Sequence, residues 1–261
     1  MAFGRATWFA GLMAELAMFP LGSVLFPHMP LLLRVFEPRY LVMLSRLLES
    51  DTAEFGVVLI ERGQEVGGGE HRFSVGTVAT VTEMGTADGT LALVAQGGRR
   101  IEVVDWLPED PHPVAEVRVL PELVWSEDDR GALENAERVV RRSLARASEF
   151  VEGSWSADVA LSDDPAEASW QLAGIAPLGE LDQVALLRST SFASLLASLA
   201  ELTAAAGEIV APAWLDPVTD AGAASDIDDG DDGDDDPLGE PDDDDDEDDD
   251  RGGEGRYGLG G

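Results

Sequence analysis

The chain has 261 residues and a formal net charge of −35, and it contains neither cysteine nor lysine, so all 17 basic residues are arginines. These absences exclude disulfides, thiolate chemistry, a GxxxxGK[ST] phosphate-binding loop, a Ser-Lys dyad and a lysine Schiff base. The negative charge argues against nonspecific binding to nucleic acid and to anionic membranes, because both need cations on the protein.

Residues 1–14 are interpreted as an N-terminal extension. Their apolar stretch, residues 6–14, is followed directly by Glu15 and lacks a clean cleavage site, so a secretion signal is not favoured. No apolar run reaches the ~18 residues that a membrane-spanning helix needs. We therefore expect a cytoplasmic protein with no membrane partner.

Residues 15–125 show a pattern that is typical of strands. Short runs rich in Val, Ile and Leu are separated by turn signals, and several runs alternate apolar and polar residues. The expected strands are 31–36, 55–60, 75–81, 90–96, 101–106 and 115–120, with turns at 62–69, 85–89, 97–98 and 108–113. Many short strands at this spacing predict a small barrel or a strongly twisted sheet.

One interruption in this region predicts a short helix over residues 38–49. Glu37 and Pro38 suit a helix start, because a first-turn proline needs no N–H partner and a carboxylate favours the positive end of the helix dipole. An apolar stripe follows at helical spacing, made of Tyr40, Leu41, Leu44, Leu47 and Leu48. Glu37 and Arg39 then have two interpretations. They are either a pair that recognises a ligand, or a structural junction bonded to nearby backbone or to Arg99 and Arg100. The junction is favoured.

After Trp125 the apolar period changes from that of strands to that of helices. Ser126 and Asp129 form a capping pair, and apolar residues then recur every three or four positions up to Val151. Further helices are predicted at 165–175, 179–188 and 191–206. Residues 126–210 are therefore expected to form a helical bundle.

The last part of the chain, residues 211–261, is an acidic tail. It holds 21 Asp and Glu against two arginines, a net charge of −19, which leaves −16 for residues 1–210. With few apolar residues to bury and strong self-repulsion, the tail is predicted to be disordered. Solubility is its favoured role, and the alternatives are binding to a basic partner and competition with acidic substrates for the arginine-containing surface.

Nothing in the sequence indicates a catalytic, metal or cofactor site. His28, His71 and His112 lie beside turn residues without metal-ligand spacing, so we expect surface histidines. The glycines at 67–69 are typical of a hairpin tip and not of a dinucleotide fingerprint. No serine lies in a G-x-S-x-G context, which leaves only a hydrolase site assembled from distant residues. We predict no catalytic residues, no metal and no cofactor.

Residues 16–44, LAMFPLGSVLFPHMPLLLRVFEPRYLVML, resemble the start of the N-terminal, substrate-binding domain of Lon proteases. The family pattern L-x-x-FPL-x-x-VLFP-x-x-x-x-L-x-x-FE-x-RY is filled by the residues at 19–21, 24–27, 31, 36–37 and 39–40. Segments 55–60, 75–81, 97–103 and 170–202 resemble later parts of the domain. The likeness covers about residues 15–205.

The resemblance implies an α+β fold: a PUA-like β-barrel of about six strands plus one short helix, a C-terminal helical bundle and the disordered acidic tail. The expected boundaries are 1–14, 15–125, 126–210 and 211–261. Complete Lon proteases add an ATPase and a Ser-Lys peptidase, which a lysine-free chain of this length lacks. We therefore expect a stand-alone, non-enzymatic module whose place is in proteolysis.

The leading functional hypothesis is a non-catalytic module that binds unfolded or partly folded polypeptide, as an adaptor or a holdase, with a protease or chaperone as a further partner. Its candidate surface is Phe26, Pro27, His28, Met29 and Trp106, in or beside loops. The alternative for Phe26 and Trp106 is that they close the barrel core. The alternative function is nucleic-acid binding by a PUA-like barrel, which the acidic body disfavours.

Overall fold

The computed structural model describes residues 13–50, 52–61, 71–87, 90–147 and 155–210. By its internal contacts the chain divides into a unit of Met1–Pro217 and a unit of Val218–Gly261. All described residues belong to the first unit. The predicted acidic tail, the glycines at 67–69 and most of the predicted N-terminal extension lie outside them.

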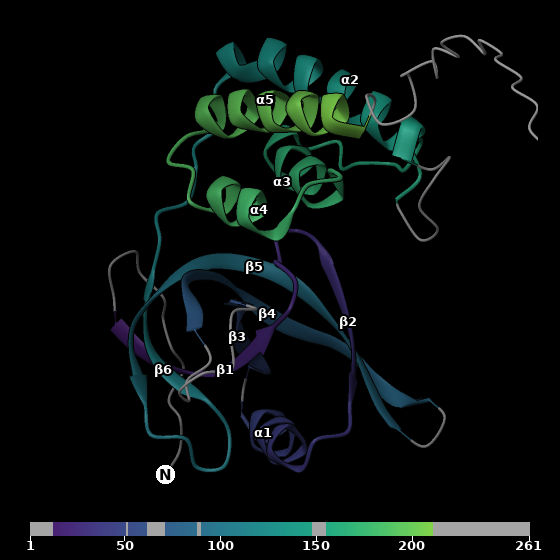
Figure 1. The fold of residues 1–261 in the computed structure, drawn as a ribbon. Coiled ribbons are helices and arrows are strands. Elements are labelled where there is room, and N and C mark those ends of the chain that lie inside the picture. The colour runs from purple at the N-terminus through teal and green to yellow at the C-terminus, as the bar shows by residue number, and fades with distance from the viewer. Residues whose placement is uncertain (1–12, 51, 62–70, 88–89, 148–154, 211–261) are drawn as a thin grey trace, which may run out of the picture. The chain divides into compact units, whose positions relative to one another are not determined.

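Six strands form one sheet, in which five strands close into a ring. The strands are β1 (Met13–Leu21), β2 (Pro30–Val35), β3 (Glu54–Glu61), β4 (His71–Ala87), β5 (Thr90–Leu107) and β6 (Val114–Val119). Their order is β2-β5-β4-β3-β1-β6, and β6 also pairs with β5, which closes the ring (Figure 1). β1 and β3 are parallel and the other pairs are antiparallel. The predicted α+β class with about six strands is confirmed.

β2 stands outside the ring. It pairs with residues 91–96 of β5, whereas β6 pairs with residues 101–107 of the same strand. Each half of the long β5 therefore has a different neighbour. In the described part of the chain, the second edge of β2 has no strand partner.

β5 is one continuous strand, so the prediction of two strands separated by a turn at 97–98 is wrong. The physical reason is close packing of main chain on main chain. A Cβ atom on Gly97 would overlap the carbonyl oxygen of Phe26. Gly97 also exchanges hydrogen bonds with the loop before β2: its N–H donates to Met29 O at 2.9 Å, and its carbonyl accepts from His28 N at 2.8 Å. Glycine within a strand marks such a close approach as well as a turn.

Helical structure begins at the three predicted start signals, at Glu37-Pro38, Ser126 and Asp164. The helical elements are α1 (Pro38–Leu48), the 3₁₀ turn η1 (Glu127–Asp129), α2 (Arg130–Ala147), α3 (Pro165–Ile175), α4 (Glu180–Leu187) and α5 (Phe192–Val210). The Ser126–Asp129 capping box is formed at η1. The carboxylate of Asp164 accepts from the N–H groups of Ala166 and Glu167 at the start of α3. Residues 148–151, the predicted end of the long helix, lie outside the described residues.

One apolar cluster joins the strands to the helices. Phe26, in the loop before β2, lies with its ring centroid 6.2 Å from that of Trp170 in α3, and Trp170 lies 6.1 Å from Phe192 in α5. The same cluster contains Tyr40 and Met43 of α1. A second, smaller cluster, which includes Met18, Ile101 and Val117, fills the strand ring. Because the larger cluster draws on strands and helices together, the apolar side chains in this cluster are buried only when both parts are present.

A buried charge, the guanidinium of Arg100 on β5, crosses this contact. The side chain is only 6% exposed. It donates to Leu187 O at 2.9 Å, in the last residue of α4, to Ser189 O at 2.6 Å, just beyond that helix, and to Pro121 O at 2.8 Å. Its carbon Cζ lies 5.0 Å from the Trp170 ring centroid. Burial lowers the pKa of the guanidinium from its usual value, yet arginine stays protonated in proteins.

We predict that Gly97→Ala destabilises the fold by roughly 1–3 kcal/mol, the usual cost of overpacking, because the added methyl group overlaps Phe26 O. Gly131→Ala is the matched control. Nothing lies within 4 Å of a Cβ at Gly131 in α2, so this change is expected to stabilise by up to about 1 kcal/mol. Urea unfolding of both variants measures the difference. Equal stabilities would contradict the close approach.

We also predict that Arg100→Ala lowers the free energy of unfolding by roughly 3–5 kcal/mol, since it leaves three buried carbonyls without their donor. Arg118→Ala is the control, because the exposed ion pair between Arg118 and Glu102 joins neighbouring strands in water. Its loss is expected to cost less than about 1 kcal/mol. Similar costs for the two substitutions, measured by urea unfolding, would show that Arg100 does not hold strands and helices together.

Candidate functional site

Three of the five residues predicted as a binding surface are buried in the structure. Phe26, at 1% exposure, is buried in the larger apolar cluster with Met29, and Pro27 between them is buried too. His28 is half-buried, and Trp106 packs on the other cluster, inside the strand ring. For Phe26 the structure therefore supports the alternative interpretation as a core residue. A binding role for His28 and Trp106 stays a prediction.

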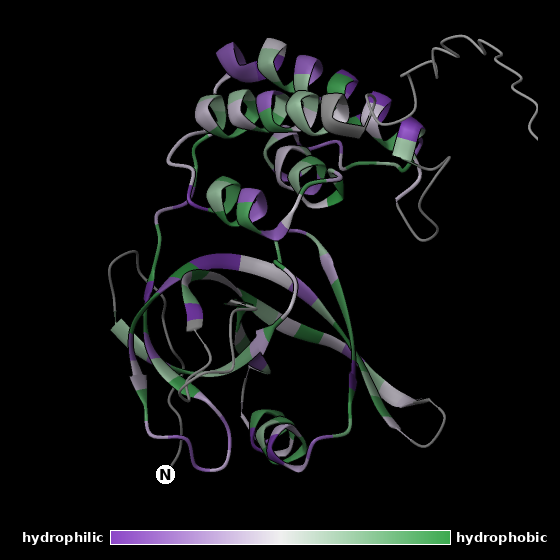
Figure 2. Cartoon of the chain, in the orientation of Figure 1, coloured by the Kyte–Doolittle hydropathy of each residue, from purple (hydrophilic) through white to green (hydrophobic). Residues whose placement is uncertain are grey.

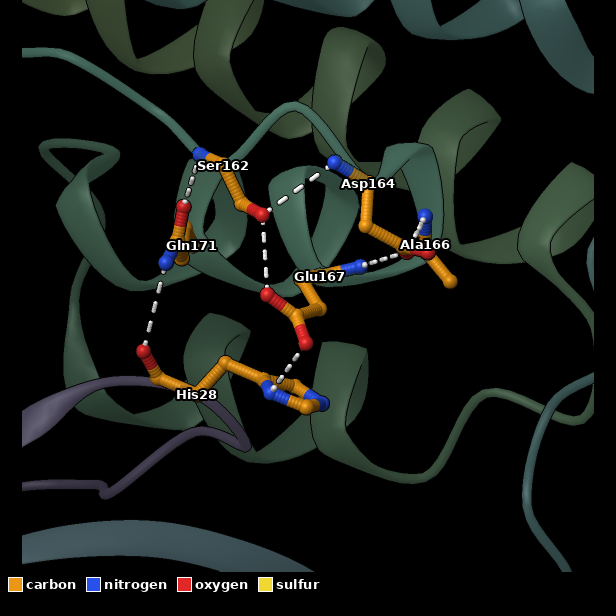
Figure 3. A network of polar contacts seen from close by, with 6 residues as sticks. All are labelled: His28, Ser162, Asp164, Ala166, Glu167 and Gln171. Carbon is orange, nitrogen blue, oxygen red and sulfur yellow. Dashed lines mark hydrogen bonds and ion pairs between the residues drawn. The ribbon is translucent and has the colours of Figure 1, made fainter.

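His28 links the loop before β2 to α3. Its backbone is in the left-handed region, with φ at 60°, which non-glycine residues seldom adopt. Its Nδ1 lies 3.6 Å from Glu167 Oε1, and its carbonyl accepts from Gln171 Nε2 at 3.5 Å (Figure 3). Ser162 completes the network, because its hydroxyl donates to Glu167 Oε2 at 2.8 Å and its N–H to Gln171 Oε1 at 2.7 Å. The arrangement holds loop and helix together.

The Glu37-Pro38-Arg39-Tyr40 motif is a strand-to-helix junction, as its favoured interpretation has it. Glu37 is the N-cap residue of α1 and Pro38 occupies its first turn. Arg39 Nε donates to Glu37 Oε2 at 2.9 Å. The ring of Tyr40 stacks on that of Phe19 in β1, with centroids 3.9 Å apart. Arg99 and Arg100 have other partners, Glu54 and main-chain carbonyls respectively.

The junction continues into a chain of charges. Arg39 lies 3.9 Å from Glu109, which accepts at 2.7 Å from Arg72 of β4, and Arg72 Cζ stands 4.4 Å from the Trp106 ring centroid. Partial burial by itself lowers the pKa of Arg39, but Tyr40, Glu37 and Glu109 together raise it above its usual value. The Trp106 ring therefore has a cation on one side in addition to its contact with the second apolar cluster.

The exposed apolar side chains of the segment from β2 to α1 define a different candidate surface. Leu32 and Phe36 are each 74% exposed. We call the following set the β2–α1 surface: Leu32, Phe36, Leu41, Val42 and Leu48. It lies on one continuous stretch of chain and includes the strand whose second edge has no strand partner in the described residues.

Sequence reasoning missed this surface. Leu31, Leu32 and Leu33 are equally apolar, so the pattern does not reveal which of them faces outward. In α1 the buried face contains Tyr40, Met43 and Leu44, whereas Leu41 and Leu48, predicted to belong to the apolar stripe, are exposed. Exposure alternates along β2, and Val35 is buried. If Val35 is assigned to the core, this alternation of side chains predicts that Leu32 is on the opposite, exposed face.

The other polar features give no reactive site. His112 is not a surface residue: it is 5% exposed, with Nδ1 3.1 Å from Pro113 O and Nε2 3.5 Å from Arg46 Nη1, so its burial is accompanied by polar partners. The side chain of His71 lies outside the described residues. Among the described side chains, no group of three His, Asp or Glu is placed to hold a metal ion.

A hollow of about 280 Å³ lies between α2 and the start of α3. Its two arginines, Arg130 and Arg141, already pair with Glu127 and Glu137. The hollow therefore offers no unpaired arginine for a ligand. None of the helices in the described residues has the length and apolar character needed to cross a membrane.

Together, a strand ring, a helical layer and an exposed apolar edge strand define an α+β module. The family model of the ATP-dependent protease La (LON) substrate-binding domain matches residues 15–204. The chain belongs to this family. Neither an ATPase nor a protease domain is found in the 261 residues. A search of the curated proteins gives no match.

Solved structures similar to the chain include two Lon N-terminal domains. A Lon N-terminal domain protein from Xanthomonas campestris is 26% identical, with a TM-score of 0.51 over 71% of this chain and 96% of that one. The N-terminal domain of the Mycobacterium avium complex Lon protease is 17% identical, with a TM-score of 0.53 over 73% of this chain and 98% of that one. The second likeness is one of fold.

We predict that His28→Val destabilises the protein by about 1–2 kcal/mol, because a β-branched residue is poorly suited to the left-handed backbone. His28→Gly is the control, since it loses the contact with Glu167 but adopts φ of 60° freely, and it is expected to stay within about 1 kcal/mol of the unchanged protein. Urea unfolding compares the two. A valine variant as stable as the glycine variant would refute the strained conformation.

Proposed function

We propose that this chain is a non-catalytic module that binds extended, unfolded or partly folded polypeptide along the β2–α1 surface. Membership of the Lon substrate-binding family supports the class of ligand. The observation that carries the choice of surface is the exposure of Leu32 and Phe36, at 74% each, on and beside a strand with a free edge in the described residues.

Two kinds of contact act together in this proposal. The free edge of β2 presents main-chain N–H and C=O groups to which an extended segment can add as a further strand, whatever its sequence. Leu32 and Phe36, four residues apart in extended chain, project on one side and favour segments with apolar residues at alternate positions. Each such side chain that is fully covered contributes roughly 1.5–3 kcal/mol.

The same surface has features that limit self-association. Arg34, exposed between Leu32 and Phe36, places a charge on the edge strand, which is a common protection against edge-to-edge pairing. The net charge of −16 over residues 1–210 makes copies of the module repel one another. A client segment without this charge is not repelled in this way.

Binding without turnover suits an adaptor or a holdase. With neither an ATPase nor a protease domain found in these residues, release of the client would depend on competition, either from refolding of the client or from a protease or chaperone partner. We extend the proposal to this role in the cytoplasm. None of the described contacts favours nucleic acid at the β2–α1 surface.

The test is the affinity for a fluorescent, permanently unfolded peptide with alternating apolar residues, followed by anisotropy. We predict that the double variant Leu32→Ser, Phe36→Ser binds at least about tenfold more weakly, because two apolar contacts are lost. The matched control is Val124→Ser, Leu181→Ser, which removes two apolar side chains that are 86% and 68% exposed elsewhere. This control is expected to change the affinity by less than about twofold.

A second peptide, N-methylated at alternate amides, separates the two kinds of contact. If main-chain pairing at β2 contributes, methylation on one edge of the peptide weakens binding and methylation on the other edge does not. Equal affinities for both double variants would reject the β2–α1 surface. No saturable binding by the unchanged protein would reject the proposed function itself.

A further inference from the structure

A row of exposed arginines runs along α2. Arg138, Arg142 and Arg146 are spaced four residues apart, so they lie above one another on one helical face. The buried face of α2 is formed by Ala136, Val140 and Leu144 and is turned towards the core. Figure 2 shows hydrophilic segments recurring along α2, which packs along α5. We call these three arginines the arginine stripe.

In the described residues, no carboxylate lies within ion-pair distance of the stripe. Arg138 donates only to the Asn135 amide oxygen at 3.1 Å, and no hydrogen bond or ion pair to a described residue is formed by Arg142 or Arg146. The contrast is on the same helix: Arg141 pairs with Glu137 at 2.8 Å. In a chain with 52 acidic residues and 17 arginines, three neighbouring arginines without an acidic partner are unexpected.

The helix dipole accounts for only one of them. A cation in the last turn of a helix is stabilising, and Arg146 is the basic residue of the last turn of α2. Arg138 and Arg142 lie further back, where the dipole has little effect. Like charges four residues apart destabilise an isolated helix. Among the described residues, no carboxylate contact offsets this repulsion between the arginines of the stripe.

The geometry points to a partner, and we propose that the arginine stripe binds an extended segment of another polypeptide that carries acidic residues at alternate positions. Arginines four residues apart are separated by about 6 Å along the helix axis. Side chains two residues apart in an extended chain repeat at about 6.6 Å. Three alternating carboxylates therefore match three arginines, and each guanidinium can hold one carboxylate with two parallel hydrogen bonds.

Charge separates this ligand from other polyanions. The protein as a whole is strongly negative, so a long nucleic acid is repelled by the body that surrounds the stripe, whereas a short acidic segment needs to approach only α2. The stripe also has no aromatic side chain on which a base could stack, since α2 contains none. The inference does not rest on the proposed function, because the β2–α1 surface belongs to other elements.

The test uses the full chain and three labelled peptides of equal length, one with three aspartates at alternate positions, one with three consecutive aspartates and one with asparagines in place of the alternating aspartates. We expect the alternating peptide to bind at low ionic strength and weaken as salt is added. Arg138→Gln, Arg142→Gln, Arg146→Gln should weaken it by at least about tenfold. The consecutive peptide should bind less tightly, and the asparagine peptide should not bind.

The control keeps the same change in net charge. Arg46→Gln, Arg118→Gln, Arg188→Gln removes three exposed arginines away from α2 and should alter the affinity by less than about threefold, as expected for long-range charge alone. Equal losses of peptide affinity in the two triple variants would overturn the proposal, because they would show that affinity depends on net charge and not on a site at the arginine stripe. Tighter binding of a single-stranded RNA of equal charge would overturn it in favour of nucleic acid.

Two more measurements ask whether the stripe is open to a partner and whether it acts independently of the β2–α1 surface. If the alternating peptide binds a chain that ends at Pro217 but not the full chain, the stripe is not open to an outside partner, and the proposal fails. If the stripe variant loses the acidic peptide but keeps the apolar peptide used for the β2–α1 surface, the two binding activities are distinct and the proposal is supported.

Discussion

The positive charge of Arg100 is buried, so it needs hydrogen-bond acceptors from the protein in place of water. The carbonyls that accept from it connect the strands to the helices. Three main-chain carbonyls, two of them at or beyond the last turn of α4, surround the guanidinium in place of a carboxylate. Carbonyls at a helix end lack partners within the helix and carry the negative end of its dipole. One side chain of β5 therefore satisfies a helix terminus, and the helix in turn makes the buried charge tolerable.

This exchange is possible because the main chains lie very close beneath it. Gly97, three residues before Arg100, lets the loop before β2 lie directly on β5. That loop carries Phe26 and Met29 into the space between strands and helices, where Trp170 and Gly174 receive them. The strained backbone of His28 follows from the same requirement, since the chain must turn sharply between two buried side chains. Rigid anchoring on this side leaves β2 free to present its other edge.

The sequence predicted the elements well wherever the signal was local. Capping residues such as Ser126 and Asp164, and the proline at the start of α1, act on their own helix and need no tertiary context. The errors came where one local pattern has two tertiary meanings. Two consecutive glycines indicate a turn or a close approach, and only the position of Phe26 decides between them.

The candidate surface shows the same limit. The prediction of Phe26, Pro27 and Met29 as part of a binding surface rests on their place in or beside a loop, but the larger apolar cluster of strands and helices buries Phe26 and Met29. Conversely, the apolar run at 31–36 does not by itself reveal that Leu32 in β2 and Phe36 just after it are exposed.

The closed ring of strands also constrains how the chain can be made. β1 begins at Met13, yet its antiparallel neighbour β6 spans Val114–Val119, so the ring cannot close until about a hundred residues have followed the first strand. At roughly 5–20 residues per second of ribosomal synthesis, β1 waits several seconds with one edge open. During that interval the nascent chain displays its own apolar strand to the cell. A protein proposed to receive unfolded chains thus passes through a stage in which it is such a chain.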